Sequence, residues 1–429
     1  MRYQTPPQGL YIKNRKKFIE NLLPKSLAVF HSNDIMPTNA DGTMRFRQNN
    51  DLLYLTGIDQ EETVLVLCPD FPNEQMREIL FLRKTNEHIA IWEGHKFTQE
   101  EAYEISGIKN IQWIENFEGV LNTLAALSEN IYLNTNEHLR ADIQVETRDA
   151  RFIKSCQERY PLHHYHRSAP IMHQLRAVKE QEEIDQLQVA CDITEKAFRR
   201  ILRFVKPGVM EYEIEAEFIH EFLRNRSRGF AYEPIIASGA SACVLHYIEN
   251  NKACKDGDLL LLDVGAEYGN YNADMTRTIP VNGRFTKRQK EIYNAVLRVH
   301  RIAPEILRPG TNIQDYHKEI GKIMEGELIE LGLLDKNDVS NQDPAQPLYR
   351  KYFMHGTSHH LGLDVHDVGT MHEPIAPGMV FTVEPGIYIP EEGIGIRLEN
   401  NFVIQEDGYL DLMKNIPIDP EEIEELMNG

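Results

Sequence analysis

Residues 257–274 read GDLLLLDVGAEYGNYNAD, and residues 378–399 read GMVFTVEPGIYIPEEGIGIRLE. In each stretch an apolar strand follows a glycine and ends on a carboxylate six residues later, Asp263 in the first and Glu384 in the second. The chain then turns through glycines into a second strand that carries another carboxylate. A returning strand places such side chains next to each other. The two stretches therefore predict two similar hairpins, each with a pair of acidic residues, and a pseudo-twofold construction.

The carboxylates of the returning strands are Asp274 and Glu399. A carboxylate at the end of a buried strand needs a compensating charge or hydrogen bonds, because its desolvation costs several kcal/mol. Taken alone, any one of the four carboxylates could be an ordinary cap at the end of a strand or one member of a buried ion pair. Four carboxylates in matched pairs instead favour a site for cations.

A histidine cluster lies between the two hairpins, in residues 354–367, MHGTSHHLGLDVHD. Its members are His355, His359, His360 and His366, and its glycines favour a loop that turns ring nitrogens inward. Four carboxylates and one imidazole form an oxygen-rich ligand set that suits two divalent ions such as Mn²⁺, Co²⁺ or Zn²⁺. The four negative charges balance two such ions. A water that bridges the ions would ionise near neutral pH and act as a nucleophile.

These motifs resemble those of the pita-bread metallopeptidases, which include methionine aminopeptidase, aminopeptidase P and prolidase. The segments that carry the resemblance are LLLLDVGA, NADMTRT, GTSHHLGLDVH, TVEPGIYI and GIRLEN. Upstream, FRQNNDLLYLTG and IAIWEG resemble the N-terminal domain of aminopeptidase P, which methionine aminopeptidases lack. The resemblance implies an α+β protein with a smaller α/β domain over residues 1–169 and a pita-bread catalytic domain over residues 170–429.

The resemblance also implies which residues form the active site. Asp274 and Glu399 would bridge both ions, and Glu384 would additionally carry a proton from the bridging hydroxide towards the leaving nitrogen. The metal ligands that the resemblance implies are Asp263, Asp274, His359, Glu384 and Glu399.

Other residues of the motifs are expected to contact the substrate. His246 and His366 match two histidines of the family that do not bind metal but contact the substrate and stabilise the oxyanion. His355 and Arg397 match positions on the proline side. Tyr388 is a candidate for the apolar slot of the proline ring, or simply packs in its strand. His360 receives no role. Trp92 either reaches a neighbouring subunit's site or packs within the first domain.

The implied activity is hydrolysis of the bond between an N-terminal residue and a following proline, in peptides with proline at the second position. That bond needs a dedicated site because its nitrogen is tertiary and held in a ring. Prolidase, which cleaves Xaa-Pro dipeptides with the same ligands, is the nearest alternative. A metal-free binding protein of the same fold is a further alternative, but such relatives depart from the ligand pattern that this chain retains.

Composition limits the class of protein. A chain of 429 residues exceeds a single core and predicts two domains. The net charge of −20 disfavours nucleic acid as a partner. No apolar stretch approaches the length of a bilayer span or of a signal-peptide core. Five scattered cysteines suit reduced thiols, so we expect a cytoplasmic protein. The family resemblance implies a homo-oligomer.

Periodicity predicts the remaining elements. Between about residues 24 and 150, the runs SLAVF, LLYLTG, TVLVLC, EILFLR and NIYLN are interpreted as strands. After Arg176, apolar residues recur every three or four positions, which predicts a long helix ended by Pro207 and Gly208. A second helix is expected from Met210 to about Arg224.

Overall fold

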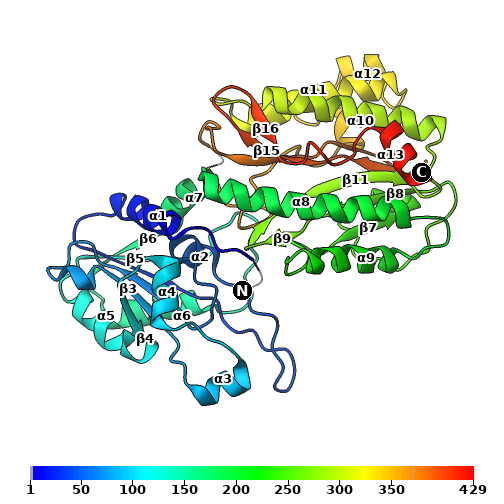
Figure 1. Ribbon diagram of the computed structural model, residues 1–429. Coiled ribbons are helices and arrows are strands. Elements are labelled where there is room, and N and C mark those ends of the chain that lie inside the picture. The colour runs from blue at the N-terminus through cyan, green and yellow to red at the C-terminus, as the bar shows by residue number, and fades with distance from the viewer. Residues whose placement is uncertain (1–2, 371) are drawn as a thin grey trace. The chain divides into compact units, whose positions relative to one another are not determined.

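The computed structural model describes residues 3–370 and 372–429, and the chain divides into two compact units (Figure 1). One unit contains residues 5–176, and the other contains residues 177–429 together with the start of the chain. Helices and strands occur in both units, which confirms the predicted α+β class.

The unit of residues 5–176 contains one six-stranded mixed sheet in the order β4-β3-β2-β1-β5-β6. The central strand β1 pairs antiparallel with β2 and parallel with β5. Residues 26–31 form β1 and are buried throughout, because both faces of the sheet are covered. The strands are β1 (Ser26–His31), β2 (Val64–Leu67), β3 (Glu78–Leu82), β4 (Asn110–Trp113), β5 (Asn130–Leu133) and β6 (His164–Arg167).

Helices surround this sheet. A cluster of buried residues that includes Leu27, Val66, Phe81 and Leu121 packs α5 against the sheet. The helices are α1 (Gln8–Glu20), α2 (Asn50–Thr56), α3 (Glu87–Glu93), α4 (Gln99–Ser106), α5 (Phe117–Ala125), α6 (Arg148–Arg159) and α7 (Ala169–Ala177), with short 3₁₀ turns η1 (Glu74–Met76) and η2 (Ile114–Asn116).

One predicted strand of this unit is wrong. The run LLYLTG belongs to helix α2. The side chain of Asn49 accepts hydrogen bonds from the backbone amides of Asp51 and Leu52, and Gly57 ends the helix in the left-handed conformation with φ +71°. Asn49 lies before the run and Gly57 is its last residue, and a short apolar run alone does not distinguish a buried helix from a buried strand.

The second unit contains several small sheets. One sheet has the order β11-β8-β7, another has the order β12-β15-β16, and β13 pairs with β14 and β9 with β10. The strands are β7 (Ile235–Ser238), β8 (Leu259–Val264), β9 (Glu267–Tyr268), β10 (Tyr271–Asn272), β11 (Met275–Pro280), β12 (Val380–Val383), β13 (Gly386–Ile389), β14 (Ile394–Arg397), β15 (Asn400–Ile404) and β16 (Tyr409–Asp411).

The helices of this unit form two pairs, in which α10 packs against α11 and α8 packs against α9; α10 contacts β12, β13 and β14, and α9 contacts β7 (Figure 1). The predicted helices after Arg176 and Met210 are confirmed as α8 and α9. The helices are α8 (Gln181–Phe204), α9 (Glu211–Arg224), α10 (Lys287–Ile306), α11 (Ile313–Glu330), α12 (Lys336–Ser340) and α13 (Pro420–Asn428), with 3₁₀ turns η3 (Gly239–Cys243) and η4 (Leu348–Lys351).

The first predicted hairpin is confirmed, because β8 pairs antiparallel with β11 from Leu259 to Val264. Gly265 follows β8, and a Cβ atom there would lie 1.8 Å from the carbonyl oxygen of Ala273. The close approach of the two backbones therefore requires glycine. The second hairpin is also antiparallel, but its ladder is divided between the pairs β12–β15 and β13–β14.

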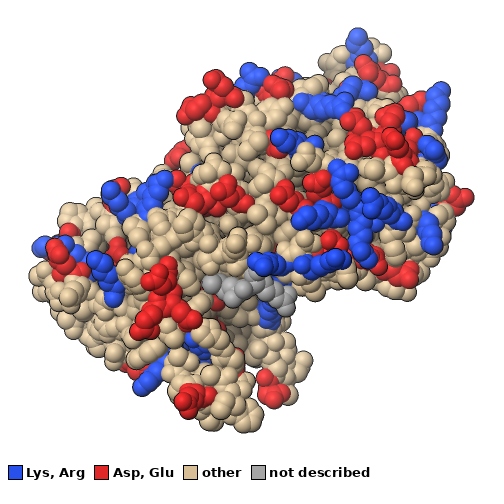
Figure 2. Space-filling view, viewed as in Figure 1, with Lys and Arg blue, Asp and Glu red and all other residues tan. Residues whose placement is uncertain are grey.

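The surface carries charges of both signs. Over the face that Figure 2 shows, Lys and Arg side chains lie among Asp and Glu side chains, while the chain as a whole has a net charge of −20. Across residues 3–370 and 372–429, no helix has both the length and the apolar composition needed to cross a bilayer.

Candidate metal centre

The first hairpin places Asp263 and Asp274 close together. Asp263 lies on β8 opposite Thr276, and Asp274 immediately precedes β11. The hydroxyl of Tyr232 contacts both carboxylates, at 2.6 Å from Asp263 Oδ1 and 2.7 Å from Asp274 Oδ1. The backbone amide of Asp274 donates to the side chain of Asn401 at 3.1 Å, which fixes the position of this carboxylate against the second hairpin.

The second hairpin places Glu384 and Glu399 at the break in its ladder. β12 pairs with β15 as far as Val383 and Asn400, so one carboxylate follows β12 and the other precedes β15. The hydroxyl of Thr276 donates to Glu399 Oε2 at 2.7 Å, and the backbone amide of Glu399 donates to the carbonyl of Thr276 at 3.0 Å. These bonds join strand β11 of the first hairpin to Glu399 of the second.

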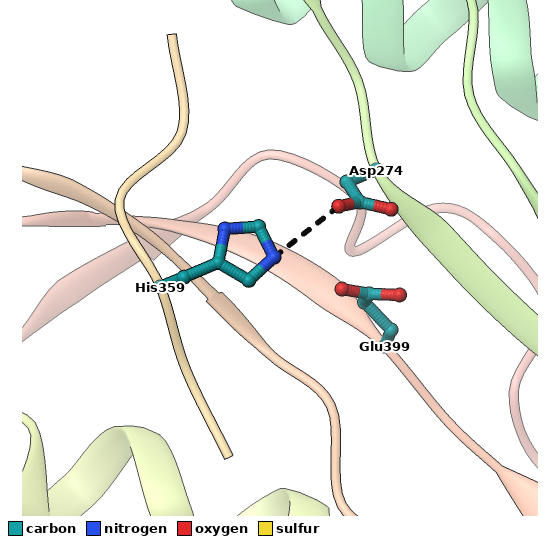
Figure 3. A group of neighbouring side chains, drawn as sticks. All are labelled: Asp274, His359 and Glu399. Carbon is teal, nitrogen blue, oxygen red and sulfur yellow. Dashed lines mark ion pairs between the residues drawn. The ribbon is translucent and has the colours of Figure 1, made fainter. Parts of the chain in front are cut away.

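His359 lies at the centre of this group. Its Nδ1 contacts the carbonyl oxygen of His360 at 2.9 Å, so Nδ1 carries the proton and Nε2 faces the carboxylates. Nε2 lies 3.5 Å from Asp274 Oδ2 and 3.6 Å from Glu384 Oε1. Figure 3 shows the ring directed at Asp274, with Glu399 beside it. One ligand atom from each of Asp274, His359 and Glu399 lies within 4.8 Å of the others.

Asp274 and Glu399 are buried and Asp263 and Glu384 are half-buried, and this environment shifts the pKa values of the group. Burial raises the pKa of Glu384 to about 7, against the charges of His359 and Arg397, which lower it. Burial and the neighbouring carboxylates raise the pKa of Glu399 well above its usual range. Burial lowers the pKa of His359, but the carboxylates of Asp274 and Glu384 outweigh it, so that pKa is raised.

This group fits divalent cations. Four carboxylates and an imidazole supply hard oxygen and nitrogen donors of the type that Mn²⁺, Co²⁺ and Zn²⁺ accept. Burial is the main cause of the raised pKa values of Glu384 and Glu399, and the neighbouring carboxylates add to it; cations placed among these groups would offset both effects. The five residues predicted as metal ligands are linked through shared neighbours at this one place.

The three residues predicted on the proline side form a chain of hydrogen bonds. Arg397 Nη1 donates to the hydroxyl of Tyr388 at 2.8 Å, and that hydroxyl lies 2.8 Å from Nε2 of His355. Nδ1 of His355 lies 2.8 Å from the carbonyl of Gly356, which makes Nδ1 the protonated nitrogen and Nε2 the acceptor. Burial, with the charge of Arg397, lowers the pKa of His355 to about 3, so its ring is neutral.

Arg397 also contacts the acidic group directly. Its Nη2 forms an ion pair with Asp263 Oδ2, and its Nε donates to Thr276 Oγ1 at 3.1 Å. Arg397 is 4% exposed and Tyr388 is fully buried. Tyr388 therefore holds the ring of His355 in place through its hydroxyl group. Arg397 balances part of the negative charge of the centre.

The remaining predicted residues differ in their exposure and surroundings. His366 is exposed, and its ring meets that of His359 at a centroid distance of 4.4 Å and an angle of 84°. His246 is exposed in a turn after η3, and its charge is among those that lower the pKa of His355. His360 is buried against Phe381, with ring centroids 4.3 Å apart. Trp92, in the other unit, is 77% exposed on α3.

Sequence reasoning missed the polar residues that hold the ligands in place, among them Tyr232, Thr276 and Asn401. Tyr232 lies 31 residues before Asp263, outside any strand or motif that carries a carboxylate. Thr276 and Asn401 do lie within the segments NADMTRTI and GIRLENN, but a threonine or asparagine beside a carboxylate is too common to single out. Their contacts depend on how the two hairpins meet.

Comparison with known families matches both units. Residues 185–406 match Metallopeptidase family M24, and residues 11–132 match the family described as Aminopeptidase P, N-terminal domain. The first match contains Asp263, Asp274 and all other residues of the candidate metal centre.

Curated relatives match over nearly the whole chain. The sequence is 38% identical over 428 residues to the Xaa-Pro aminopeptidase of Escherichia coli (strain K12), covering 97% of this chain and 96% of that protein. It is 31% identical over 412 residues to Xaa-Pro aminopeptidase 3 of Rattus norvegicus, covering 92% of this chain and 79% of that protein.

Solved structures agree with the sequence matches. Aminopeptidase PepP of Pseudomonas aeruginosa superposes with a TM-score of 0.88 at 31% identity, covering 99% of this chain and 98% of that one. Zn-substituted Escherichia coli aminopeptidase P in complex with product gives a TM-score of 0.86 at 35% identity, covering 99% of both chains.

Proposed function

We infer that this chain, which belongs to Metallopeptidase family M24, is a metal-dependent aminopeptidase that hydrolyses the bond between an N-terminal residue and a following proline. The observation that carries this conclusion is the cluster of Asp274, His359 and Glu399, drawn from three distant segments to within metal-ligand range. The match of residues 11–132 to the aminopeptidase P N-terminal domain favours aminopeptidase over prolidase.

We propose that two divalent ions bind between the hairpins, with Mn²⁺ as the native metal and Co²⁺ or Zn²⁺ as substitutes. Bound here, such ions would supply an activated water and would polarise the scissile carbonyl. Asp274 and Glu399 stand between the two halves of the site and would bridge the ions. The full set of proposed ligands is Asp263, Asp274, His359, Glu384 and Glu399.

The chain's own residues would then direct the reaction. Glu384, which lies beside His359 in this group, would pass a proton towards the leaving nitrogen. His366 and His246 are exposed beside His359 and His355, where they would contact the substrate and stabilise the negative charge on the carbonyl oxygen. His355, with Tyr388 and Arg397 behind it, would line the proline side.

We further propose that the protein is a cytoplasmic homo-oligomer acting on peptides with proline at the second position. Its five free cysteines are consistent with a reducing compartment. Ile91 and Trp92 on α3 are 79% and 77% exposed, an unusual exposure for large apolar side chains, and contact between subunits would cover them. Sedimentation of the purified protein as a monomer at micromolar concentration would contradict the oligomer.

Three peptides test the proposed function: Xaa-Pro, Xaa-Pro-Xaa and Xaa-Ala-Xaa, at one metal concentration and one pH. A prolidase must favour a free carboxylate on proline, whereas an aminopeptidase leaves that side open and gains binding energy from the chain beyond it. We expect the highest kcat/KM on Xaa-Pro-Xaa. Preference for the dipeptide would identify a prolidase, and equal cleavage of the alanine peptide would remove proline specificity.

A further inference from the structure

A buried ion pair lies beside the metal centre without contributing a ligand to it. Lys179 Nζ lies 2.9 Å from Asp367 Oδ2, and both side chains are only 1% exposed. The desolvation of two buried charges commonly costs more free energy than their mutual attraction contributes. A buried ion pair is therefore weak evidence for stability. What it does impose is a fixed distance between two segments that are 188 residues apart in sequence.

Lys179 is itself held firmly. It precedes α8, and its backbone amide donates to the carbonyl of Gly378 at 2.9 Å. The neighbouring Val178 forms a β-bridge with Met379, directly before β12. The ammonium group therefore projects from backbone that is tied to the strand ending at Glu384.

Asp367 lies in the loop of residues 361–370, which has no regular secondary structure and is anchored at both ends. The amide of Leu361 donates to the carbonyl of Val380 at 3.1 Å, and the amide of Asp367 donates to the carbonyl of His360 at 2.9 Å. The side chain of Asn272 donates to the carbonyls of Gly362 at 3.1 Å and of the next residue at 2.9 Å.

The ion pair passes directly over Gly362. A Cβ atom at this position would lie 2.2 Å from Asp367 Oδ2 and 2.9 Å from Lys179 Cε. The loop therefore turns back at Gly362, and the side chain of Lys179 packs against this turn. The amide of Val368 donates to the second oxygen of Asp367 at 2.9 Å, so both carboxylate oxygens are used to hold the loop.

The residue before Asp367 is His366, whose exposed ring crosses that of His359 at 4.4 Å. We propose that the Lys179–Asp367 ion pair positions His366 for the reaction, so that Lys179 is a positioning residue although it touches neither metal nor substrate. The inference rests on the proposed function of His366. A displacement of about 1 Å at a reacting group can reduce a rate by about 100-fold, so catalysis is sensitive to the ion pair that holds the residue next to His366.

The test is a double-mutant cycle between Lys179→Met and His366→Ala, with kcat and KM on an Xaa-Pro-Xaa peptide and metal content measured for each variant. Lys179→Met alone should lower kcat by about 10- to 100-fold, with metal content and KM near those of wild type. In the His366→Ala background the same substitution should change kcat by less than about 2-fold, because the group it positions is gone. Lys179→Arg should recover part of the lost kcat.

A control separates positioning from general destabilisation. Arg15 is a buried residue of the other unit, 1% exposed and paired with Glu78 at 3.1 Å. Arg15→Met should lower the unfolding midpoint and leave kcat unchanged. If Lys179→Met does not fold, Lys179→Met with Asp367→Leu removes both charges together and leaves neither buried alone. That double variant should show the same loss in kcat.

The outcomes separate the two claims. Equal losses in kcat from Lys179→Met with and without His366 would overturn the positioning proposal and leave the proposed function standing. Wild-type kcat in the folded variant that carries both Lys179→Met and Asp367→Leu would also overturn the positioning proposal. Loss of metal in Lys179→Met would do the same. Wild-type kcat in His366→Ala would instead remove the role of His366, and the positioning proposal with it.

Discussion

Tyr232 is the residue on which the first pair of carboxylates converges. Its single hydroxyl lies within 2.7 Å of both Asp263 and Asp274. Partners of this kind orient ligands, and their loss typically reduces metal affinity by about 10- to 100-fold. We expect Tyr232→Phe to weaken metal binding by that factor, as measured by titration of the metal-free protein.

A matched substitution controls for the loss of a buried hydroxyl. Tyr293 is fully buried on α10 and donates to the carbonyl of Ile418 at 2.7 Å, a contact that involves none of the proposed ligands. Tyr293→Phe should affect the unfolding midpoint and leave metal affinity unchanged. Equal metal affinity in Tyr232→Phe and wild type would show that the tyrosine does not orient the ligands.

Substitution of a metal ligand should abolish both metal binding and activity, whereas substitution of a residue that only contacts the substrate should reduce activity alone. Glu399→Ala deletes a proposed bridging ligand and should lose bound metal together with activity. His366→Ala should retain the metal and lose about 100-fold or more in kcat, the scale of losing an acid, base or oxyanion donor. Metal analysis and peptide kinetics on the same preparations distinguish the two. Full metal content in Glu399→Ala would contradict its assignment.

At the residue scale, the pattern of the two hairpins pointed to the four carboxylates and a dense cluster pointed to the histidines, and the family resemblance then selected His359 from that cluster. It could not predict that Arg397 would pair with Asp263, since that contact joins β14 to β8 across 134 positions. Tyr388 was open to two interpretations, because only the packed structure shows that its hydroxyl is enclosed by Arg397 and His355.

Among the elements, the hairpin of β8 and β11 depends on Gly265. A Cβ atom at 1.8 Å from the carbonyl of Ala273 would force the strands apart, and overpacking of this kind costs about 3 kcal/mol. Gly265→Ala should therefore lower the free energy of unfolding by about that amount and reduce metal content. Gly326→Ala is the control, because that glycine lies in α11 with nothing within 4 Å.

The control should be neutral or should stabilise the protein by up to about 1 kcal/mol, since alanine is the better helix former. Urea unfolding and metal analysis of both variants provide the comparison. Unchanged stability and metal content in Gly265→Ala would mean that the hairpin tolerates separation of its strands.

Helix α10 carries a histidine that links stability to pH. Burial, aided by the charge of Arg277, lowers the pKa of His300 to about 3 from its ordinary 6.5. Between those values the unfolded chain binds a proton that the folded chain does not, so this group stabilises the fold above pH 6.5 and that contribution is lost as pH falls towards 3. His300→Leu should make the free energy of unfolding less dependent on pH between 4 and 6, by up to about 1.4 kcal/mol per pH unit. Identical pH dependence in both proteins would show that His300 is not responsible.

At the element scale, helical periodicity predicted α8 and α9 because their apolar residues repeat over many turns. Helix α2 was predicted as a strand because its apolar run is too short to establish a period, and the caps at Asn49 and Gly57 decide its conformation. The division of the second hairpin into two strand pairs was also beyond the sequence, because it depends on pairing with different neighbours on either side of Glu384 and Glu399.

For the whole molecule, length and composition predicted two units, and the motifs placed all proposed metal ligands in the second. Residues 177–429 bring together carboxylates from two hairpins and a histidine from the loop between them, so the metal centre exists only when that unit is folded. The first unit contributes the aminopeptidase P N-terminal domain, the feature that most clearly separates this chain from prolidase.

The central claim is that hydrolysis of Xaa-Pro-Xaa peptides depends on divalent metal held by this unit. The most direct measurement is the rate of N-terminal residue release by one preparation before chelation, after prolonged chelation, and after addition of Mn²⁺, Co²⁺ or Zn²⁺, with bound metal determined at each stage. We predict that activity disappears with the metal and returns with it, at about two ions per chain by the proposed ligand count. Full activity in protein shown to contain no metal would contradict the account.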